Sequence, residues 1–376
     1  MSKIQEFVKK HNIPALGFGC MRLPTLGAED KINIEDTKVM VDTYMEAGFN
    51  YFDTAYMYHG GNSEYAVKEA VVSRYKREDF ILVDKMPIWK VESKEDVKKI
   101  FEDQLEKCGV EYFDIYLLHA INGEQNTKHE EMGSYDFFKK MKEEGKIKIF
   151  GFSYHGSTED LEIIMEKHHK EFDIVQLQLN YFDWAKGWAK DQFEIIKSYE
   201  KPVITMEPVR GGMLARLPED IGSSLKDLNT NVSQASWAIR WLMDIPEVIT
   251  ILSGMSDLQQ IKDNIQTVKA LGSLTEDERR TVDEVAKKLV EMPQVACTSC
   301  NYCTNCPVEI PIAEVFTMYN KFLENRSMST LAGSYSEIEA NKNASACISC
   351  QICVEVCPQN INIPEKMKEI ALLIEG

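Results

Sequence analysis

Eight short apolar segments, separated by stretches of helical periodicity, repeat along residues 15–252 of this chain. The apolar segments are rich in branched and aromatic residues and span 15–19, 49–52, 80–83, 113–118, 147–151, 174–177, 203–206 and 248–252. Several of the helices between them begin at a serine or threonine cap, and we expect them at 34–47, 63–75, 93–108, 134–144, 158–168, 188–199 and 233–243. This alternation predicts a parallel sheet covered by helices, and eight units favour a closed (β/α)8 TIM barrel over an open doubly wound sheet.

Two closely spaced cysteine runs near the C-terminus contain eight of the ten cysteines. The first, Cys-x2-Cys-x2-Cys-x2-Cys-Pro, comprises Cys297, Cys300, Cys303 and Cys306. The second has the bacterial ferredoxin pattern Cys-x2-Cys-x2-Cys-x3-Cys-Pro, whose fourth cysteine binds the other cluster of a pair, and comprises Cys347, Cys350, Cys353 and Cys357. We therefore predict two 4Fe–4S clusters with these eight ligands. Because the first run is shorter before its last cysteine, the sequence leaves open whether Cys306 binds the cluster of its own run or the other one.

Zinc binding and disulfide bonding are the alternative uses of such cysteines. Zinc ribbons place two Cys-x2-Cys pairs about a dozen or more residues apart, whereas the pairs within each run here are adjacent. Disulfides need an oxidising compartment, and residues 1–17 lack the apolar core of a signal peptide, so we expect a cytoplasmic protein. Cys20 and Cys108 stand apart from the runs, and burial as a small side chain is the commoner role of such cysteines.

Composition divides the chain into two unequal parts. With 376 residues and 44% hydrophobic content it can bury one large core, and we place a barrel domain at 1–290 and a cysteine-rich domain at 291–376. Segments 312–326 and 334–344, between the cysteine runs, are helix-like, which favours a small α-helical ferredoxin-like domain. A net charge of −17 argues against nucleic-acid or anionic-membrane partners, and no segment approaches the roughly 18 apolar residues of a membrane span.

Polar residues at the ends of three consecutive apolar segments form a candidate catalytic group: Asp53 and Tyr58, then Lys85, then His119. Barrel enzymes place their catalytic residues at the carboxyl ends of strands, so these side chains should meet at one rim. Carbonyl reduction needs a proton donor for the oxygen as hydride reaches the carbon. Tyr58 would donate, with its pKa lowered by Lys85, while Asp53 holds Lys85 and His119 hydrogen-bonds the substrate oxygen. Each residue alone also has an ordinary structural explanation, but four at successive strand ends favour catalysis.

Residues 13–290 resemble the aldo-keto reductase family. The resemblance is carried by LGFGCMRLP, AGFNYFDTAYMYHGGNSE, VDKMP, LEKCGVEYFDIYLLHA, GKIKIFGFS, VQLQLNYFD, MEPVRGGML and SGMSDLQQIKDN. Together with the cysteine runs, the whole chain is similar to the branch of this family that has a C-terminal ferredoxin-type domain. The resemblance implies a nicotinamide cofactor across the barrel mouth and a small carbonyl or alcohol substrate.

The resemblance also implies which residues contact the nicotinamide cofactor. Ser153 and Gln176 match positions that bind its carboxamide, although Tyr154 replaces the usual asparagine and Met206 the usual stacking aromatic. The other expected contacts are Cys20, Met21, Pro208, Gly211, Gly212, Ser253, Gly254, Met255, Gln260 and Asn264. Gly254 and Gln260 stand where a lysine and an arginine often bind the 2′-phosphate, which should disfavour NADPH relative to NADH unless Arg22 or Arg210 compensates.

Hydride transfer moves two electrons, whereas each cluster normally passes one, so three functions stay open. The first is NAD(P)H-linked carbonyl reduction or alcohol oxidation, with clusters that dock the C-terminal domain or exchange electrons with a ferredoxin-like or other electron-transfer protein. The second is a reductase that uses one-electron steps and holds flavin or draws on the clusters. The third is an electron-transfer protein whose barrel is a scaffold without catalysis. The acidic charge favours a basic or neutral protein partner.

Overall fold

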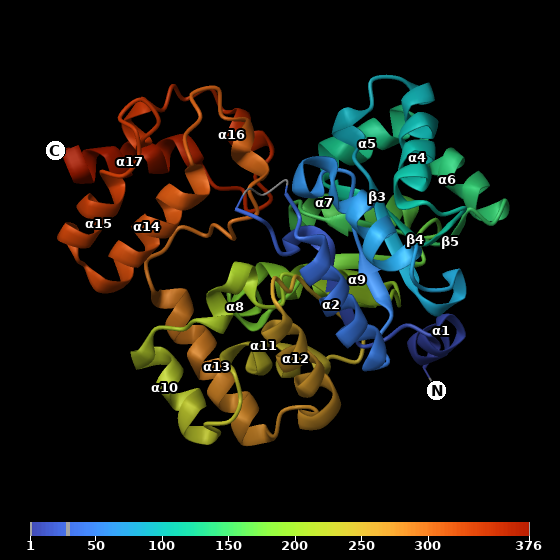
Figure 1. Cartoon of the computed structure of the whole chain (residues 1–376), viewed down its shortest axis with the longest axis horizontal. Helices are drawn as coiled ribbons and strands as arrows, with labels where there is room; N and C mark the ends of the chain where they lie inside the picture. Colours follow the sequence, from blue (N-terminus) through green and yellow to red (C-terminus); the bar gives the residue numbers. More distant parts are fainter. Residues whose placement is uncertain (1, 28–30, 376) are drawn as a thin grey trace.

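Eight parallel strands close into a barrel in this computed structural model, which describes residues 2–27 and 31–375 (Figure 1). The strands follow the order of the chain, and β8 pairs with β1 to complete the cylinder. They are β1 (Leu16–Gly19), β2 (Tyr51–Asp53), β3 (Ile81–Met86), β4 (Phe113–Ile121), β5 (Ile147–Tyr154), β6 (Ile174–Gln178), β7 (Val203–Met206) and β8 (Val248–Ser253). The (β/α)8 barrel expected from the alternating pattern is confirmed.

Helices pack around the barrel at the predicted places, with one interruption and several additions. The expected helices are α2 (Ile34–Glu46), α4 (Lys94–Cys108), α6 (Ser134–Glu143), α7 (Thr158–His168), α9 (Trp188–Ser198) and α11 (Gln234–Met243). The helix expected at 63–75 is instead α3 (Ser63–Val67) followed by one π-helical turn, η3 (Lys68–Val72). The helices that the pattern did not predict are α5 (Gly123–Glu131), α8 (Tyr181–Ala185), α10 (Glu219–Leu228), α12 (Leu258–Gln266) and α13 (Glu276–Glu291).

An apolar cluster fills the barrel interior near the amino ends of the strands. It contains Tyr51, Ile81, Val83, Ile115, Leu117, Ile149, Ile174 and Ile204, which are all buried. The N-terminal helix α1 (Lys3–His11) packs Ile4, Phe7 and Val8 against this cluster and so closes that end of the barrel. The interior is therefore a packed core, and the carboxyl ends of the strands form the open mouth.

The C-terminal part has a separate and smaller apolar cluster. It is helical, with α14 (Ile312–Asn325), α15 (Met328–Tyr335), α16 (Ile352–Glu355) and α17 (Ile363–Glu375), and lies beside the barrel (Figure 1). The prediction of a helix at 334–344 was wrong, because α15 ends at Tyr335 and turns follow it. There the Asn343 side chain accepts hydrogen bonds from the backbone and hydroxyl of Ser345, and such local bonds compete with helix formation. Within the described residues, no helix combines the length and apolarity needed to cross a membrane.

Candidate active site

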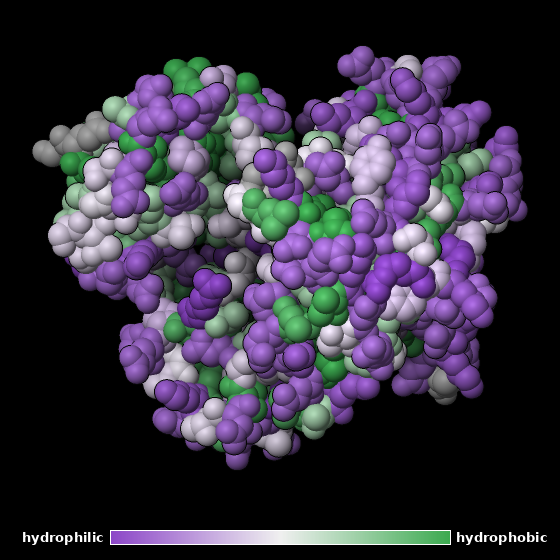
Figure 2. Space-filling model, viewed as in Figure 1, coloured by the Kyte–Doolittle hydropathy of each residue, from purple (hydrophilic) through white to green (hydrophobic). Residues whose placement is uncertain are grey.

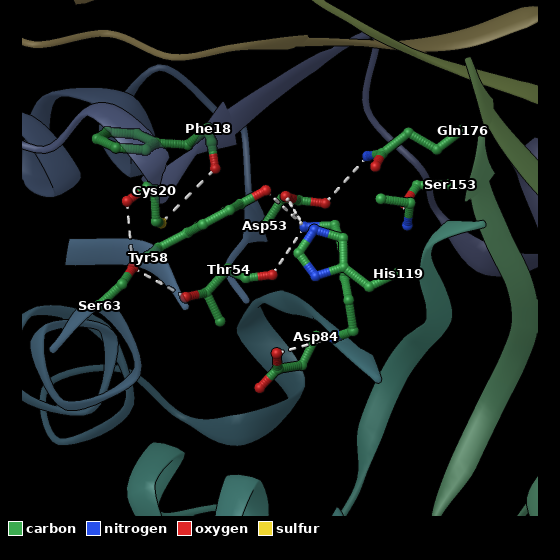
Figure 3. Close-up of polar contacts among 12 residues, drawn as sticks. Phe18, Cys20, Asp53, Thr54, Tyr58, Ser63, Asp84, His119, Ser153 and Gln176 are labelled. Atoms are coloured by element: carbon green, nitrogen blue, oxygen red, sulfur yellow. Dashed lines mark hydrogen bonds and ion pairs between the residues drawn. The ribbon is translucent and has the colours of Figure 1, made fainter. Parts of the chain in front are cut away.

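Asp53, Lys85 and His119 lie on three consecutive strands, and Tyr58 lies on the loop that follows the first of them. Asp53 ends β2, whereas Lys85 and His119 lie inside β3 and β4, which extend further than the sequence suggested. Tyr58 begins a short turn, η2 (Tyr58–Gly61), in which His59 adopts a left-handed conformation. Figure 3 shows Asp53, Tyr58 and His119 gathered in one place, so the structure brings the four expected catalytic residues together.

The Lys85 ammonium lies at the centre of this group. Its Nζ donates to Asp53 Oδ1 at 2.5 Å, to the Thr54 carbonyl at 2.8 Å and to the Tyr58 hydroxyl at 3.2 Å. The second carboxylate oxygen of Asp53 accepts from Gln176 Nε2 at 3.2 Å. Only 1% of either charged side chain is exposed, so this is a buried ion pair whose remaining polar atoms are hydrogen-bonded.

The environment of Tyr58 raises its pKa, contrary to the expectation that Lys85 lowers it. Burial raises the pKa of Tyr58 well above the usual range, and the Asp53 carboxylate adds to that rise. Burial also raises the pKa of Asp53 against the opposing influence of Lys85. The sequence indicated that the Lys85 ammonium would lie near Tyr58 but not how deeply Tyr58 would be buried, and burial has the larger effect on its pKa. Tyr58 is therefore a protonated phenol and a potential proton donor.

His119 is a neutral imidazole at the edge of the same group. Burial, with a further contribution from the Lys85 charge, lowers the pKa of His119 well below its usual value. Its ring lies 5.1 Å from that of Trp89 and 6.0 Å from that of Tyr58, measured between centroids. His119 Nε2 is 3.4 Å from the hydroxyl of Tyr302, a residue of the C-terminal domain. A neutral ring suits a hydrogen bond to a carbonyl oxygen.

A cavity of about 550 Å³ opens above these residues and is walled by both parts of the chain. The barrel contributes Asp53, Tyr58, His119 and His155, and the C-terminal domain contributes Thr298, Cys300, Tyr302, Pro358 and Gln359. The surface is hollowed where the C-terminal lobe meets the barrel in the view of Figure 2. The candidate active site is therefore a composite of two domains.

Most of the expected cofactor contacts line this cavity. They are Met21, Ser153, Gln176, Met206, Pro208, Gly211, Gly212, Ser253, Gly254, Gln260 and Asn264. Cys20 and Met255 do not line it, because both side chains are buried in the core between the sheet and the helices. The Cys20 thiol lies 3.8 Å from the Phe18 carbonyl, so this residue packs behind the site rather than in it.

The loop after β7 is built to contact the C-terminal domain. Gly211 has a φ of +63°, and a Cβ there would lie 2.4 Å from the Thr298 carbonyl oxygen, so only glycine allows the two backbones this close. Arg22 donates to the same carbonyl at 2.9 Å. Arg210 is buried in an ion pair with Asp183 and also donates to the Ala296 carbonyl at 3.4 Å. The two arginines considered for phosphate binding therefore hold the domains together.

Cysteines of the two runs lie close to one another. Cys357 of the second run lines one small cavity together with Cys297, Cys300 and Cys303 of the first. The thiol of Cys353 lies near those of Cys347, Cys350 and, from the first run, Cys306. Four thiols around a common space are the donor set of an iron–sulfur cluster, so the residues fit such a group. Cys306 thus lies close to the second run.

Sequence reasoning did not find Tyr302, His155 and Trp89. All three lie outside the strands and motifs that the sequence identified. They lie near the expected catalytic group only because of the way the loops and domains pack. Burial lowers the pKa of His155 to about 4, so it too is neutral. The one available signal was an aromatic residue between two ligand cysteines, and that alone does not indicate where its side chain points.

Comparison with known proteins finds matches in two separate parts of the chain. A profile described as the aldo/keto reductase family matches residues 15–287, and one described as a 4Fe-4S dicluster domain matches residues 296–362. The uncharacterized oxidoreductase YqkF of Bacillus subtilis is 24% identical over 310 residues, which cover 74% of this chain and 94% of that protein. L-galactose dehydrogenase of Arabidopsis thaliana is 24% identical over 299 residues, covering 73% of this chain and 89% of that protein.

Solved structures show the same barrel. The holo form of aldo-keto reductase AKR11C1 from Bacillus halodurans is 26% identical with a TM-score of 0.59, covering 73% of this chain and 92% of that one. An aldo-keto reductase from Klebsiella pneumoniae in complex with NADPH is 21% identical with a TM-score of 0.58, covering 76% and 94% of the two chains. The matched parts correspond to the barrel and leave the cysteine-rich domain as an addition to it.

Proposed function

This chain belongs to the aldo/keto reductase family and is an oxidoreductase with a 4Fe–4S domain, and on that premise we propose that it interconverts a carbonyl compound and its alcohol with Tyr58 as the proton donor. The observation that carries the proposal is the buried Asp53–Lys85 pair with Lys85 Nζ 3.2 Å from the Tyr58 hydroxyl. A bound nicotinamide would supply or accept the hydride. The chain supplies the proton and the charge stabilisation.

Each of the four residues has a distinct task in this proposal. Tyr58 gives its proton to the carbonyl oxygen as that oxygen gains negative charge, and it takes the proton back in the reverse direction. Lys85 stabilises the phenolate that remains, and Asp53 keeps the ammonium charged and in place. His119, neutral and close by, donates a hydrogen bond that orients the carbonyl oxygen.

The polar residues of the cavity fit a nicotinamide cofactor. Ser153 and Gln176 present side chains beside Asp53, and Asn264 donates to Ser253 Oγ at 3.0 Å, which forms a polar patch further along the cavity. Gly254 and Gln260 bring no positive charge for a 2′-phosphate. We therefore propose NADH as the better cofactor, because Arg22 and Arg210 are engaged between the domains.

Replacement of Tyr58 by phenylalanine tests the proposal. With NADH or NADPH and a panel of aldehydes such as 4-nitrobenzaldehyde, Tyr58→Phe should lower kcat by about 10²–10⁴-fold, the usual contribution of general acid catalysis. Tyr56→Phe is the matched control, since Tyr56 lies on the same loop and instead packs against Lys107 at 3.8 Å. An undiminished kcat in Tyr58→Phe with full iron content would remove Tyr58 from the reaction.

A second candidate function is reduction by single-electron steps, and the position of Cys300 favours it. Cys300 lines both the small cavity of its cysteine group and the large cavity that contains Tyr58. We propose two 4Fe–4S clusters, one held by Cys297, Cys300, Cys303 and Cys357 and the other by Cys306, Cys347, Cys350 and Cys353. Clusters so held would carry single electrons. Anaerobic iron and sulfide analysis with a visible spectrum tests their number, and a flavin spectrum would favour one-electron chemistry in the barrel.

The segment around Cys350 is the proposed contact for an electron-transfer protein. Cys350 is exposed, and the nearby Ile348 and Ile352 are 61% and 40% exposed, so apolar side chains surround a ligand cysteine at the surface. The chain's net charge of −17 favours a partner with a basic face. Cytochrome c, a basic haem protein, is a suitable probe. Its reduction by the prereduced protein should slow in Ile348→Lys, which removes an apolar side chain and adds a like charge, and an unchanged rate would place the contact elsewhere.

A further inference from the structure

The phenol of Tyr302 reaches from the first cysteine run into the catalytic group. Tyr302 begins the turn η8 (Tyr302–Asn305), between the expected ligands Cys300 and Cys303. Its hydroxyl lies 3.4 Å from His119 Nε2, and its side chain lies next to that of Tyr58 and interacts with it. One oxygen atom of the C-terminal domain thus contacts both groups that the proposed function assigns to the carbonyl oxygen.

A substrate oxygen and the Tyr302 hydroxyl oxygen cannot both occupy the position beside Tyr58 and His119. Reduction of a carbonyl requires its oxygen within hydrogen-bond distance of the proton donor and of the orienting imidazole. Those are the Tyr58 hydroxyl and His119 Nε2, and the Tyr302 hydroxyl already contacts both. A compound can react only after its oxygen has replaced that hydroxyl.

The segment before Tyr302 and a second part of the C-terminal domain are both bonded to the barrel, so this position is not that of a loose side chain. Thr298 is held through its carbonyl by Arg22 at 2.9 Å and lies against Gly211. The amides of Gln178 and Gln359 exchange two hydrogen bonds, of 2.7 and 3.1 Å, across the same interface. Docking of the C-terminal domain therefore delivers the Tyr302 ring to the pocket.

We propose that Tyr302 is a specificity-determining residue of the barrel pocket, which admits carbonyl compounds only when their oxygen displaces its phenol from Tyr58 and His119. The inference rests on the proposed function, because it takes these two residues as the binding place of the carbonyl oxygen. It assigns to the cysteine-rich domain a role in substrate choice, in addition to electron exchange.

Binding of benzaldehyde to the full-length protein, prepared anaerobically with its iron and saturated with NAD⁺, tests this role without turnover. In Tyr302→Phe the ring stays but the competing hydroxyl is lost, so the dissociation constant measured by calorimetry should fall roughly fivefold, the equivalent of one ordinary hydrogen bond. In Tyr302→Ala the ring is lost as well, and the constant should fall about tenfold or more. In turnover with NADH the gain should appear in KM, with kcat little changed.

Tyr319→Phe is the matched control, because Tyr319 lies in the same domain and its hydroxyl bonds Glu369 instead of the pocket. Equal or weaker benzaldehyde binding in Tyr302→Phe, at full iron content, overturns the inference, and so does a lack of binding in every variant. If Tyr302→Ala loses iron, Tyr302→Phe decides alone. Failure of the proposed function shows separately, as unchanged turnover in Tyr58→Phe with Tyr302 intact.

Discussion

The barrel and the C-terminal domain of this chain are stabilised in different ways. The barrel has a packed interior, a second apolar layer beneath its helices and a closed sheet without edges. The C-terminal domain has one smaller apolar cluster, a few helices and eight cysteines, four of which line one small cavity. A small domain of this kind needs covalent or metal crosslinks to fold, whereas the barrel does not. The proposed catalytic residues thus belong to the self-sufficient part, whereas part of the pocket wall belongs to the 4Fe–4S domain.

Removal of iron should separate the two regions most strongly. After anaerobic chelation, residues 296–362 should become sensitive to protease while the barrel stays resistant, because ligand binding and folding are coupled in metal-dependent domains. Limited proteolysis with mass spectrometry, together with far-UV circular dichroism, measures both effects. Equal resistance of the C-terminal domain with and without iron would contradict the comparison.

Loss of the buried ammonium should destabilise the barrel alone. Lys85→Met leaves the Asp53 carboxylate buried without its partner, and such changes cost about 3–5 kcal/mol. Urea unfolding followed by circular dichroism measures this loss, and the visible spectrum of the iron–sulfur domain should be unaffected. Lys85→Met combined with Asp53→Asn should recover part of the stability. A single variant as stable as the wild type would show that Asp53 is protonated or solvated.

A methyl group at Gly211 should weaken the contact between the regions. Gly211→Ala places a Cβ 2.4 Å from the Thr298 carbonyl, so the C-terminal domain must move away. Gly212→Ala is the matched control, because Gly212 also has a positive φ but no atom of the described residues lies within 4 Å of where its Cβ would stand. Hydrogen exchange at residues 298–302 should be at least about tenfold faster in Gly211→Ala than in the control, as expected for a lost docking energy of more than about 1.4 kcal/mol. Equal exchange in the two variants would mean that this loop does not set the docking.

A buried carboxyl pair in the barrel should make its stability depend on pH. Burial, with the nearby Asp84, raises the pKa of Glu64 to about 9, and Lys107 at 3.5 Å only partly opposes this. Because the folded state favours the protonated acid, the stabilisation is complete below the unfolded pKa, about 4.3, and is lost as pH rises through the folded pKa. Urea midpoints should therefore fall from pH 6 to pH 9.

Glu64→Gln removes this titration and should lessen the fall by roughly 1–2 kcal/mol, since each unit of pKa shift is worth about 1.4 kcal/mol and the pair shares its effect. Glu102→Gln, at an exposed position of α4, is the control and should leave the pH dependence unchanged. A parallel fall in Glu64→Gln and the wild type would assign the effect to other groups.

The sequence predicted the barrel because its determinants are local. Continuous apolar segments such as Val203–Met206 are strands at the expected bounds, and turn residues end them. The catalytic group was also predictable, since strand ends in a barrel converge wherever the strands pair in order. The extra length of β4 and β5 was not, because it depends on burial on both faces of the sheet rather than on local pattern.

The remaining parts of the site depend on contacts between distant residues. Nothing local to Tyr302 indicates that it meets His119, and nothing local to Gly211 indicates that it lies against Thr298. Cys20 was expected to contact the cofactor but lies in the core, because a shift of one position along a segment moves a side chain to its other face. The sign of the pKa shift of Tyr58 was wrong because the extent of its burial is a property of the assembled fold.

Helix α1 closes the end of the barrel at the amino ends of the strands, where Ile4, Phe7 and Val8 pack against the interior. Whatever approaches Tyr58 must therefore cross the opposite rim, and the cysteine-rich domain is fastened to that rim. A ligand enters and leaves through the same end of the barrel to which the C-terminal domain is attached. Tighter attachment of that domain should therefore lengthen the residence time of a bound ligand.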